Sequence, residues 1–406
     1  METNSRTQLL STRRRVLLAK LVLLAGGCLA GLLLAEVGLR VIGFGLGTDS
    51  AFQPDPYCGV RHVPNYRGWH TREGRVWIEI NSHGFRDWER TVDKPPDTYR
   101  IAVIGDSYAE ALQVDLDHTF WSVMERKLAE SWRGNGQRVE VLNFGVSGFG
   151  TAQELEMLRH YVWDYQPDLI MLQFFAANDV CDNSRKLDPD TARPYYTLDG
   201  ERLVLDDSFL QDPERVRFQS SRWIKLKDAV VQHSRVAALI YQFRHQKRAP
   251  MPTDGAEAGL AMQAFREPDT PAWQDAWAVT DRLVMEMASE AQSHGAEFVV
   301  LMANCGVEVD PQDAARERVL KRLGMKDLLY PERRMTALGA AHGFTVIRLA
   351  EAMRTYCRDH QVYLHGFANT RPGTGHWNET GHDVAGEQAA AHLTESSGGR
   401  DERDGR

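Results

Sequence analysis

The sequence predicts an α/β fold: a three-layer αβα sandwich with a mostly parallel five-stranded sheet, preceded by an N-terminal transmembrane helix. Strand and helix patterns alternate along the chain, which is typical of a parallel sheet with helices on both faces. An apolar run of 20 residues near the N-terminus predicts the membrane span. The expected strands are five short apolar runs, at residues 101–104, 139–143, 167–175, 296–303 and 344–349.

The helices expected between these strands follow from apolar spacing and from glycine at helix ends. Residues 120–132 and 152–165 carry apolar side chains at helical spacing. The last two strands each follow a helical segment that ends in His-Gly, at Gly295 and Gly343, where glycine suits a helix C-cap.

Composition excludes several classes of protein. The chain has 406 residues, with 43% hydrophobic and 26% charged residues, which is ordinary for a globular protein. Its net charge of −8 argues against a nucleic-acid surface. The five cysteines form no Cys-x-x-Cys pair, which argues against a zinc ribbon or a thioredoxin-type centre. Their pairing in an oxidising compartment is left open.

The N-terminus has the pattern of a membrane anchor. Three arginines, Arg13 to Arg15, precede the apolar residues 16–35, whose only charge is Lys20. Twenty apolar residues match a bilayer core of about 30 Å, and the basic cluster is expected to stay inside. We therefore expect an uncleaved single-pass anchor in the inner (cell) membrane, with the remainder on the periplasmic, extracytoplasmic side. A cleaved signal peptide, a lipoprotein at Cys28 and a buried soluble helix are the alternatives.

Shifts in composition predict the domain organisation. Proline-rich and glycine-rich residues separate the anchor from the first strand, and the segment after the third strand interrupts the alternation of strand and helix. That segment is interpreted as an insertion, with a lid or specificity role as a hypothesis. The expected parts are a cytoplasmic N-terminus (1–15), the anchor (16–42), a juxtamembrane lead-in with short β elements (43–98), the main domain (99–395) with its insertion (184–270), and a disordered tail (396–406).

Four loops carry candidate catalytic residues. Gly105-Asp106-Ser107 follows the first strand, where the ends of parallel strands expose side chains at a favoured site for chemistry. Taken alone it is also typical of a turn with a helix cap. Gly148 and Asn178 follow the second and third strands, and His376 precedes the last helix.

This ordered set resembles the SGNH, or GDSL-like, family of esterases and acylhydrolases, of a membrane-anchored bacterial type. The resemblance covers about residues 99–392, outside the insertion, and is most specific in residues 99–107 and in the His376-Trp-Asn-x-x-Gly-His382 segment. It implies a flavodoxin-like SGNH hydrolase fold and a carboxylesterase-type hydrolase without a cofactor. It also implies that Ser107 is the nucleophile.

Acyl transfer explains why these residue types are needed. A serine hydroxyl needs a base, for which His376 is the candidate. The tetrahedral oxyanion needs fixed donors, which the backbone N–H groups of Ser107 and Gly148 and the Asn178 side chain would supply. Asp106, Asp179 and His382 are secondary candidates. The histidines show no metal-ligand spacing, so no metal site is expected.

One position departs from the family pattern. An aspartate usually lies three residues before the catalytic histidine, but this sequence has Gly373 there. Three arrangements remain open: a Ser-His dyad with a backbone carbonyl on the second imidazole nitrogen, a carboxylate from elsewhere in the chain, or a weakly active or binding domain. We favour the dyad, because the oxyanion positions and His376 are all present.

The function expected is that of a membrane-anchored serine esterase acting on an acyl ester, such as an O-acetyl ester, of an envelope carbohydrate or lipid. An acyltransferase acting on an envelope polysaccharide is the first alternative. A non-catalytic binding or assembly module is the second, since the usual acid is missing. The expected partners are the ester substrate and the membrane, with no nucleic acid.

Overall fold

The computed structural model describes residues 2–41, 51–132, 138–245 and 260–404. It divides into two compact units. One comprises Met1–Ser50 with Ser220–Arg248, and the other comprises Ala51–Gln219 with Ala249–Arg406. The expected glycine-rich joint at residues 43–50, the turn at 134–136 and the linker at 248–258 lie outside the described residues.

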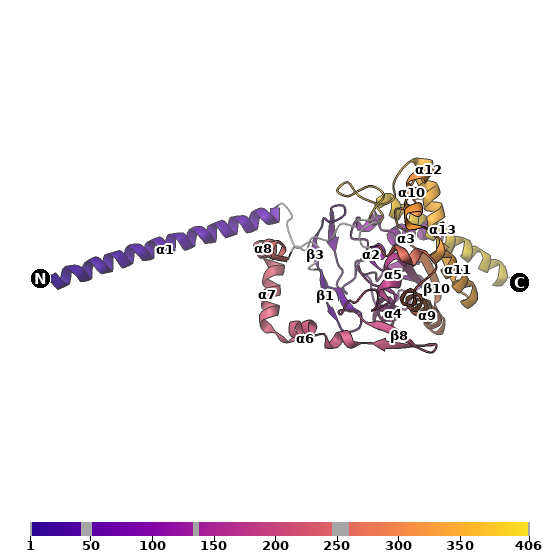
Figure 1. Ribbon diagram of the computed structural model, residues 1–406, viewed down its shortest axis with the longest axis horizontal. Helices are drawn as coiled ribbons and strands as arrows, with labels where there is room; N and C mark the ends of the chain where they lie inside the picture. The colour runs from indigo at the N-terminus through magenta and orange to yellow at the C-terminus, as the bar shows by residue number, and fades with distance from the viewer. Residues whose placement is uncertain (1, 42–50, 133–137, 246–259, 405–406) are drawn as a thin grey trace. The chain divides into compact units, whose positions relative to one another are not determined.

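A five-stranded parallel sheet forms the centre of the larger unit (Figure 1). Its strands are β5 (Thr98–Ile104), β6 (Arg138–Asn143), β7 (Leu169–Phe174), β10 (Glu297–Met302) and β11 (Thr345–Arg348). They lie in the order β11-β10-β7-β5-β6, and every pair is parallel. This is the 2-1-3-4-5 order of flavodoxin-like folds, so the predicted fold class is confirmed.

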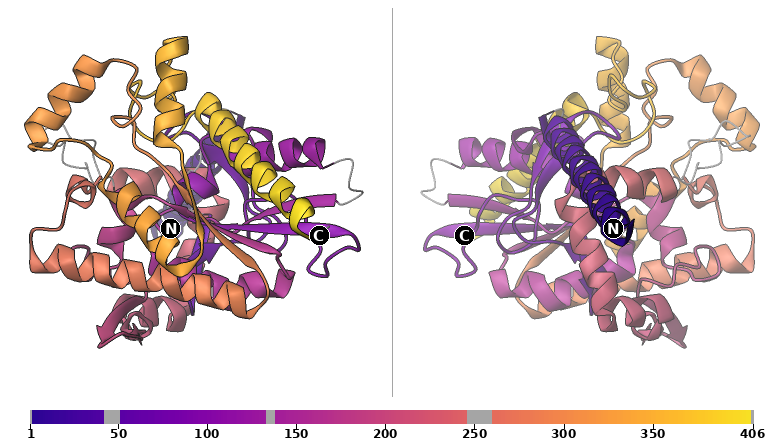
Figure 2. Two further views of the ribbon diagram at one scale, coloured as in Figure 1. Left: turned by 90° about the vertical axis from the view of Figure 1, so that its right-hand side faces the viewer. Right: turned by 90° about the vertical axis from the view of Figure 1, so that its left-hand side faces the viewer.

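Helices cover both faces of the sheet, as Figure 2 shows. On one face, Ile101, Val103 and Leu301 pack in one apolar cluster with α3 (Phe120–Ser131), α12 (Ala350–His360) and α13 (Glu379–Asp404). On the other, Ala102, Ile104 and their neighbours pack with α4 (Thr151–Met157), α9 (Pro271–Ser293) and α11 (Tyr330–His342). Alternate residues of one strand therefore enter opposite cores, which explains why the strands are continuously apolar.

The lead-in before β5 consists of two β-hairpins. β1 (Phe52–Asp55) pairs with β2 (Gly59–His62), and β3 (Arg67–His70) pairs with β4 (Val76–Glu79), all antiparallel. The alternation in β4 buries Val76 and Ile78 and exposes Trp77. These hairpins lie in the same compact unit as the sheet.

Three helical segments differ from expectation. Residues 152–165 form α4 and then a π-helical turn (Leu158–Val162) and a 3₁₀ turn (Trp163–Tyr165). The sequence favours one helical stretch over residues 221–243 of the insertion, but it is divided at Ser234 into α7 (Arg222–His233) and α8 (Arg235–His245), because the Ser234 hydroxyl caps α8. α13 continues to Asp404, into residues 396–404 of the segment predicted to be a disordered tail.

The insertion is shared between the two units. Its first part holds the hairpin β8 (Tyr195–Asp199) and β9 (Arg202–Asp206), with Tyr195 and Tyr196 buried in the larger unit. Residues 220–248 belong instead to the unit of the N-terminal helix α1 (Glu2–Val41). Within α1, Leu18–Val41 has a mean hydropathy of 2.2 and is long and apolar enough to cross a membrane, a test that a signal sequence also passes.

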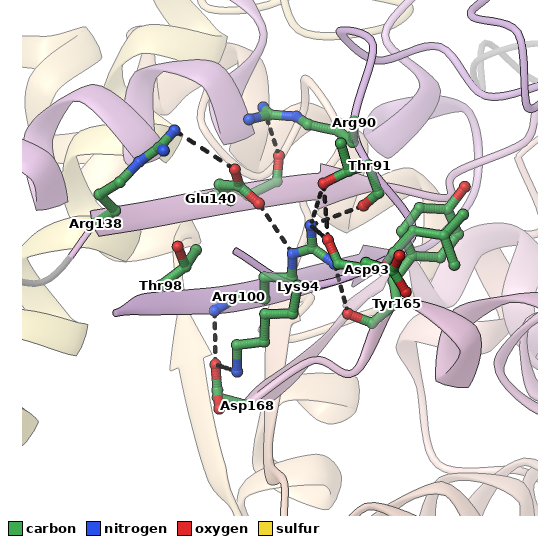
Figure 3. A network of polar contacts seen from close by, with 12 residues as sticks. Arg90, Thr91, Asp93, Lys94, Thr98, Arg100, Arg138, Glu140, Tyr165 and Asp168 are labelled. Carbon is green, nitrogen blue, oxygen red and sulfur yellow. Dashed lines mark hydrogen bonds and ion pairs between the residues drawn. The ribbon is translucent and has the colours of Figure 1, made fainter. Parts of the chain in front are cut away.

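A buried arginine joins the lead-in to the amino edge of the sheet (Figure 3). Arg100 on β5 is fully buried, and its Nε donates to Glu140 on β6 at 2.9 Å. Its Nη atoms donate to the carbonyls of Thr91, Val92 and Tyr165 at 2.7–2.9 Å. The buried guanidinium thus has acceptors in three backbone carbonyls and one carboxylate.

Replacing this arginine is expected to be strongly destabilising. Arg100→Met leaves Glu140 and the carbonyls without their donor, and removal of one partner of a buried pair costs about 3–5 kcal/mol. Urea unfolding of the full chain in detergent, followed by tryptophan fluorescence, measures the loss. The matched control is Arg138→Met, since Arg138 also faces Glu140 but is 69% exposed. Equal unfolding midpoints for the two variants would contradict the prediction.

Candidate active site

Ser107 is presented by a tight turn after β5. Asp106 accepts a hydrogen bond from the backbone N–H of Tyr108 at 2.9 Å and so caps the short helix α2 (Ser107–Glu110). Gly105 is required here, because a Cβ at this position would lie 2.5 Å from Oε1 of Gln173 on β7. The same Oε1 accepts from the N–H groups of Asp106 and Ala109. The turn is therefore fixed against the neighbouring strand.

The strand-end loops leave few residues accessible. Between residues 101 and 114, only Ser107 is not buried. Between residues 139 and 158, only Ser147 and Gly148 are not, and between 169 and 180, only Asn178. Since β7, β5 and β6 are adjacent in the sheet, their carboxyl ends bring these loops together at one edge.

The histidine before the last helix reaches the serine. Nε2 of His376 lies 2.7 Å from Oγ of Ser107, in hydrogen-bond contact. The His376 ring packs against the ring of Tyr108, and the next residue, Trp377, is fully buried. Trp377 donates from Nε1 to Oδ1 of Asn304 at 3.2 Å, which fixes the loop that carries His376. The pairing of Ser107 and His376 expected from the sequence is present in the geometry.

A carboxylate stands behind the histidine. Oε2 of Glu73 lies 2.8 Å from Nδ1 of His376 and also accepts the backbone N–H of His376 at 3.0 Å. Nδ1 is therefore the protonated nitrogen, and Nε2 is free to accept the proton of Ser107. The dyad with a backbone carbonyl, which we favoured from the sequence, is wrong. The second of the open arrangements, a carboxylate from elsewhere in the chain, is the one present.

Glu73 reaches the site from the turn between β3 and β4. Asn369 holds this turn, accepting from the N–H of Gly74 and donating to the carbonyls of Thr71 and Gly74. Beside the Glu73 carboxylate, position 375 must be glycine, because a Cβ there would lie 2.9 Å from both carboxylate oxygens. The absence of a side chain beside His376 thus makes room for the acid.

The position usually held by the acid is sterically closed to one. Gly373 has φ = +76°, and a Cβ there would lie 2.9 Å from the ring of Tyr363. Its carbonyl also lies so close to Gly306 that a side chain at Gly306 would clash with it. A left-handed glycine in this turn explains why the carboxylate comes from another segment.

The charge of Glu73 is matched to its partner. Burial acts to raise the pKa of Glu73, but the hydrogen bonds and charge of His376 outweigh it and lower the pKa below its usual value. The side chains of Glu73 and His376 are 23% and 26% exposed, so the pair is accessible from solvent. The carboxylate is ionised at neutral pH and can stabilise an imidazolium.

The three expected oxyanion donors occupy suitable elements. Ser107 is the first residue of α2, so its N–H is among those without an acceptor in the helix. Gly148 has φ = +78° and nothing within 4 Å of where a Cβ would lie. Asn178 lies in the first turn of α5 (Ala176–Asp182), and its Nδ2 donates to Oδ2 of Asp106 at 2.8 Å. Their role as an oxyanion hole stays a prediction.

A second set of contacts, not anticipated from the sequence, holds the loop of Gly148. Ser147 donates a short hydrogen bond to Glu110, the last residue of α2. The other oxygen of Glu110 lies 2.5 Å from Nε2 of His62 on β2, and both side chains are fully buried. No sequence motif marks Glu73, Glu110 or His62, because each acts across a long separation in the chain.

The secondary candidates Asp106, Asp179 and His382 make hydrogen bonds that hold the fold around the site. Asp106 caps α2 and holds Asn178, as described. Asp179 accepts the N–H of Phe175 at 2.6 Å. His382 is buried, stacks on Phe120 and accepts the N–H of that residue at 3.3 Å, while burial lowers its pKa well below the usual value. Neither Asp179 nor His382 is bonded to Ser107 or His376 within the part of the chain that the structure describes.

Proteins similar to this chain were found among solved structures. No family model matches the chain, and no curated protein does. The chain is similar to solved hydrolases. An alpha/beta hydrolase enzyme from the metagenome of Lake Arreo, Spain, is 15% identical, with a TM-score of 0.36 over 74% of this chain and 97% of that one. The lipase/acylhydrolase from Enterococcus faecalis is 13% identical, with a TM-score of 0.33 over 73% and 96%.

A third similar structure is a catalytic mutant of an acetylxylan esterase from Geobacillus stearothermophilus, 9% identical, with a TM-score of 0.36 over 71% of this chain and 91% of that one. The function proposed below takes nothing from these similarities and rests on the geometry of the site.

Three buried carboxyl groups lie behind the nucleophile turn. Burial raises the pKa of Asp106 to about 6. Burial and the charges of its acidic neighbours raise the pKa of Glu154 well above its usual value, and the same holds for Asp179. Both oxygens of Glu154 are buried without a hydrogen-bond partner. Each of these groups therefore holds its proton to a higher pH in the folded state than in the unfolded chain.

This arrangement predicts a pH dependence of stability. A carboxyl group whose folded pKa is raised binds a proton on folding between its unfolded and folded pKa values. The free energy of unfolding therefore falls as pH rises above about 4, by up to about 1.4 kcal/mol per pH unit for each group, until the folded pKa of that group is passed. Glu154→Gln cannot ionise, so its stability relative to the wild type should increase across that range. Unfolding at several pH values measures the slope.

The exposed Glu130→Gln on α3 is the matched control and should keep the wild-type slope. If Glu154→Gln also keeps that slope, Glu154 does not titrate as described.

Proposed function

We propose that this protein is a membrane-anchored serine ester hydrolase in which Ser107, His376 and Glu73 act as nucleophile, base and orienting acid. The observation that carries the proposal is the continuous chain of hydrogen bonds from Ser107 through His376 to Glu73, at 2.7 and 2.8 Å. All three residues are partly accessible, so a substrate can reach them. Such a chain is the arrangement that activates a serine hydroxyl.

The proposed reaction follows from the position of each group. Oγ of Ser107 attacks the carbonyl carbon of the ester while Nε2 of His376 takes its proton. The imidazolium is stabilised by the Glu73 carboxylate, and the oxyanion by the N–H groups of Ser107 and Gly148 and by the Asn178 amide. His376 then protonates the leaving alcohol oxygen. Water, deprotonated by the same histidine, releases the acid and restores Ser107.

The location of the reaction is part of the proposal. The apolar segment Leu18–Val41 has the length of a span, and the arginines before it favour the inner side. The catalytic unit would then face the periplasm or cell exterior. Acyl esters of envelope carbohydrates or lipids, such as O-acetyl esters, are the substrates within reach of such a site.

Transfer to an acceptor alcohol in place of water would use the same residues, so an acyltransferase remains the alternative. Product analysis with and without a sugar acceptor distinguishes the two. A non-catalytic module has no observation in its favour, because its ground was the missing acid and the Glu73 carboxylate is bonded to Nδ1 of His376.

The nucleophile is tested by covalent labelling. A fluorophosphonate probe should modify Ser107 in the folded full-length protein, because His376 makes that hydroxyl reactive. Ser107→Ala should abolish labelling and lower hydrolysis of a small acetyl ester by about 10⁴-fold or more. The exposed Ser131→Ala on α3 is the control and should behave as the wild type. Labelling that survives in Ser107→Ala, or a wild type that does not label, would refute the assignment.

The acid is tested by a pair of variants on one hairpin. Glu73→Gln keeps the shape of the side chain but removes the charge that fixes the imidazole tautomer, so kcat should fall by about 10²–10⁴-fold. Glu79→Gln on β4 changes a 55% exposed glutamate and should leave kcat unchanged. Steady-state hydrolysis of the same ester provides the measurement. Full activity in Glu73→Gln would mean that His376 needs no carboxylate.

A further inference from the structure

The helices α7 and α8 carry an unusual outward surface. Trp223, Leu226 and Val230 lie on one face of α7, at positions i, i+3 and i+7, and are 74%, 55% and 50% exposed. On α8, Ile240 and Phe243 lie one turn apart and are 50% and 76% exposed. Large apolar side chains gathered in this way on a water-facing surface indicate a binding surface. We call these five residues the α7–α8 apolar face.

The two helices are built as a unit that turns this face outward. Val231 and Ala238 are buried, so small apolar residues lie on the inner side. Nζ of Lys227 on α7 lies 5.7 Å from the ring centroid of Tyr241 on α8, a cation–π contact that joins the pair. Each of the five side chains of the apolar face is at least half exposed, so this face is not the packing surface between the two helices.

The α7–α8 pair is fastened to the end of the apolar helix α1. The carboxylate of Glu36 accepts from the N–H groups of Arg235 and Val236 and from the Ser234 hydroxyl, at 2.8–3.1 Å, and so caps α8. Arg40 donates to the carbonyl of His233, at the end of α7, at 2.9 Å. Both residues of α1 thus bind the junction between the two helices.

This attachment fixes the depth of the pair relative to a bilayer. Leu18–Val41 has 24 residues, about 36 Å at 1.5 Å per residue, against a hydrocarbon core of about 30 Å. Glu36 and Arg40 lie in its last two turns, directly after the apolar residues 16–35 that match the core, and so at the headgroup region. The junction of α7 and α8 is therefore held at the level of the membrane surface.

The charge of the segment is complementary to anionic lipid. Residues 222–248 contain seven lysines and arginines and one aspartate, in a chain whose net charge is −8. Arg222, Lys227 and Arg244 are exposed beside the apolar face. Basic residues combined with Trp, Tyr and Phe on helices are typical of segments that lie in the plane of the membrane interface.

We propose that the α7–α8 apolar face inserts into the outer interface of the bilayer that α1 spans, with its basic residues at anionic headgroups. The inference rests on the proposed membrane anchor. The protein then has a second membrane attachment beside the span. This attachment is the part of the insertion that follows the β8–β9 hairpin. Part of the insertion is then a membrane-contact element.

Spin labels on the full-length protein test this placement. Cys28→Ser and Cys181→Ser remove the accessible thiols, and a label is introduced by Leu226→Cys or Phe243→Cys in nanodiscs containing phosphatidylglycerol. Lipid contact predicts that the ratio of oxygen to nickel-complex accessibility is several-fold higher at these positions than at the control Val204→Cys. Val204 lies on β9 and is 40% exposed.

Two results at Leu226→Cys and Phe243→Cys would overturn the inference. A ratio equal to that at Val204→Cys would show that the labels face water, and low accessibility to both reagents would show that they contact protein. Leu29→Cys on α1 separates this inference from the anchor, because a water-like ratio there would refute the span itself. Ester hydrolysis in each labelled variant tests the proposed function independently, since none of the labelled positions belongs to the site.

Discussion

The hydrogen bond between Glu73 and Nδ1 of His376 is the interaction on which the site depends, because it decides which imidazole nitrogen faces Ser107. It constrains the surrounding chain as well. Gly375 must lack a side chain to admit the carboxylate, and Asn369 must hold the β3–β4 turn. Loops from near both ends of the larger unit therefore meet at the 2.8 Å hydrogen bond between Glu73 and His376.

Three of the candidate residues taken from the sequence share a property. Ser107, Gly148 and Asn178 each follow a strand directly, so the order of strands places them at one edge without knowledge of distant contacts. Glu73 lies in a hairpin turn whose position depends on packing against residues about 300 positions later. Nothing in its local sequence distinguishes it from Glu79, six residues away, which is exposed.

The fold was predictable for the same reason, and its departures are tertiary in origin. Continuous apolar runs identify the buried strands, whereas the break at Ser234 arises because Glu36, nearly 200 residues earlier, caps the second helix. The role of Arg100 was equally hidden: its charge gives no sign of burial, and the carbonyls that it satisfies come from segments on either side of β5.

The origin of Glu73 in the lead-in bears on how this protein can be divided. A fragment that begins at residue 98 would contain the whole five-stranded sheet, Ser107 and His376, yet would lack Glu73. The α/β module thus does not contain the whole of the proposed active site. A recombined gene or an expression fragment that covers only the module would encode the sheet and its helices without Glu73. The β3–β4 hairpin therefore has to be included with the module.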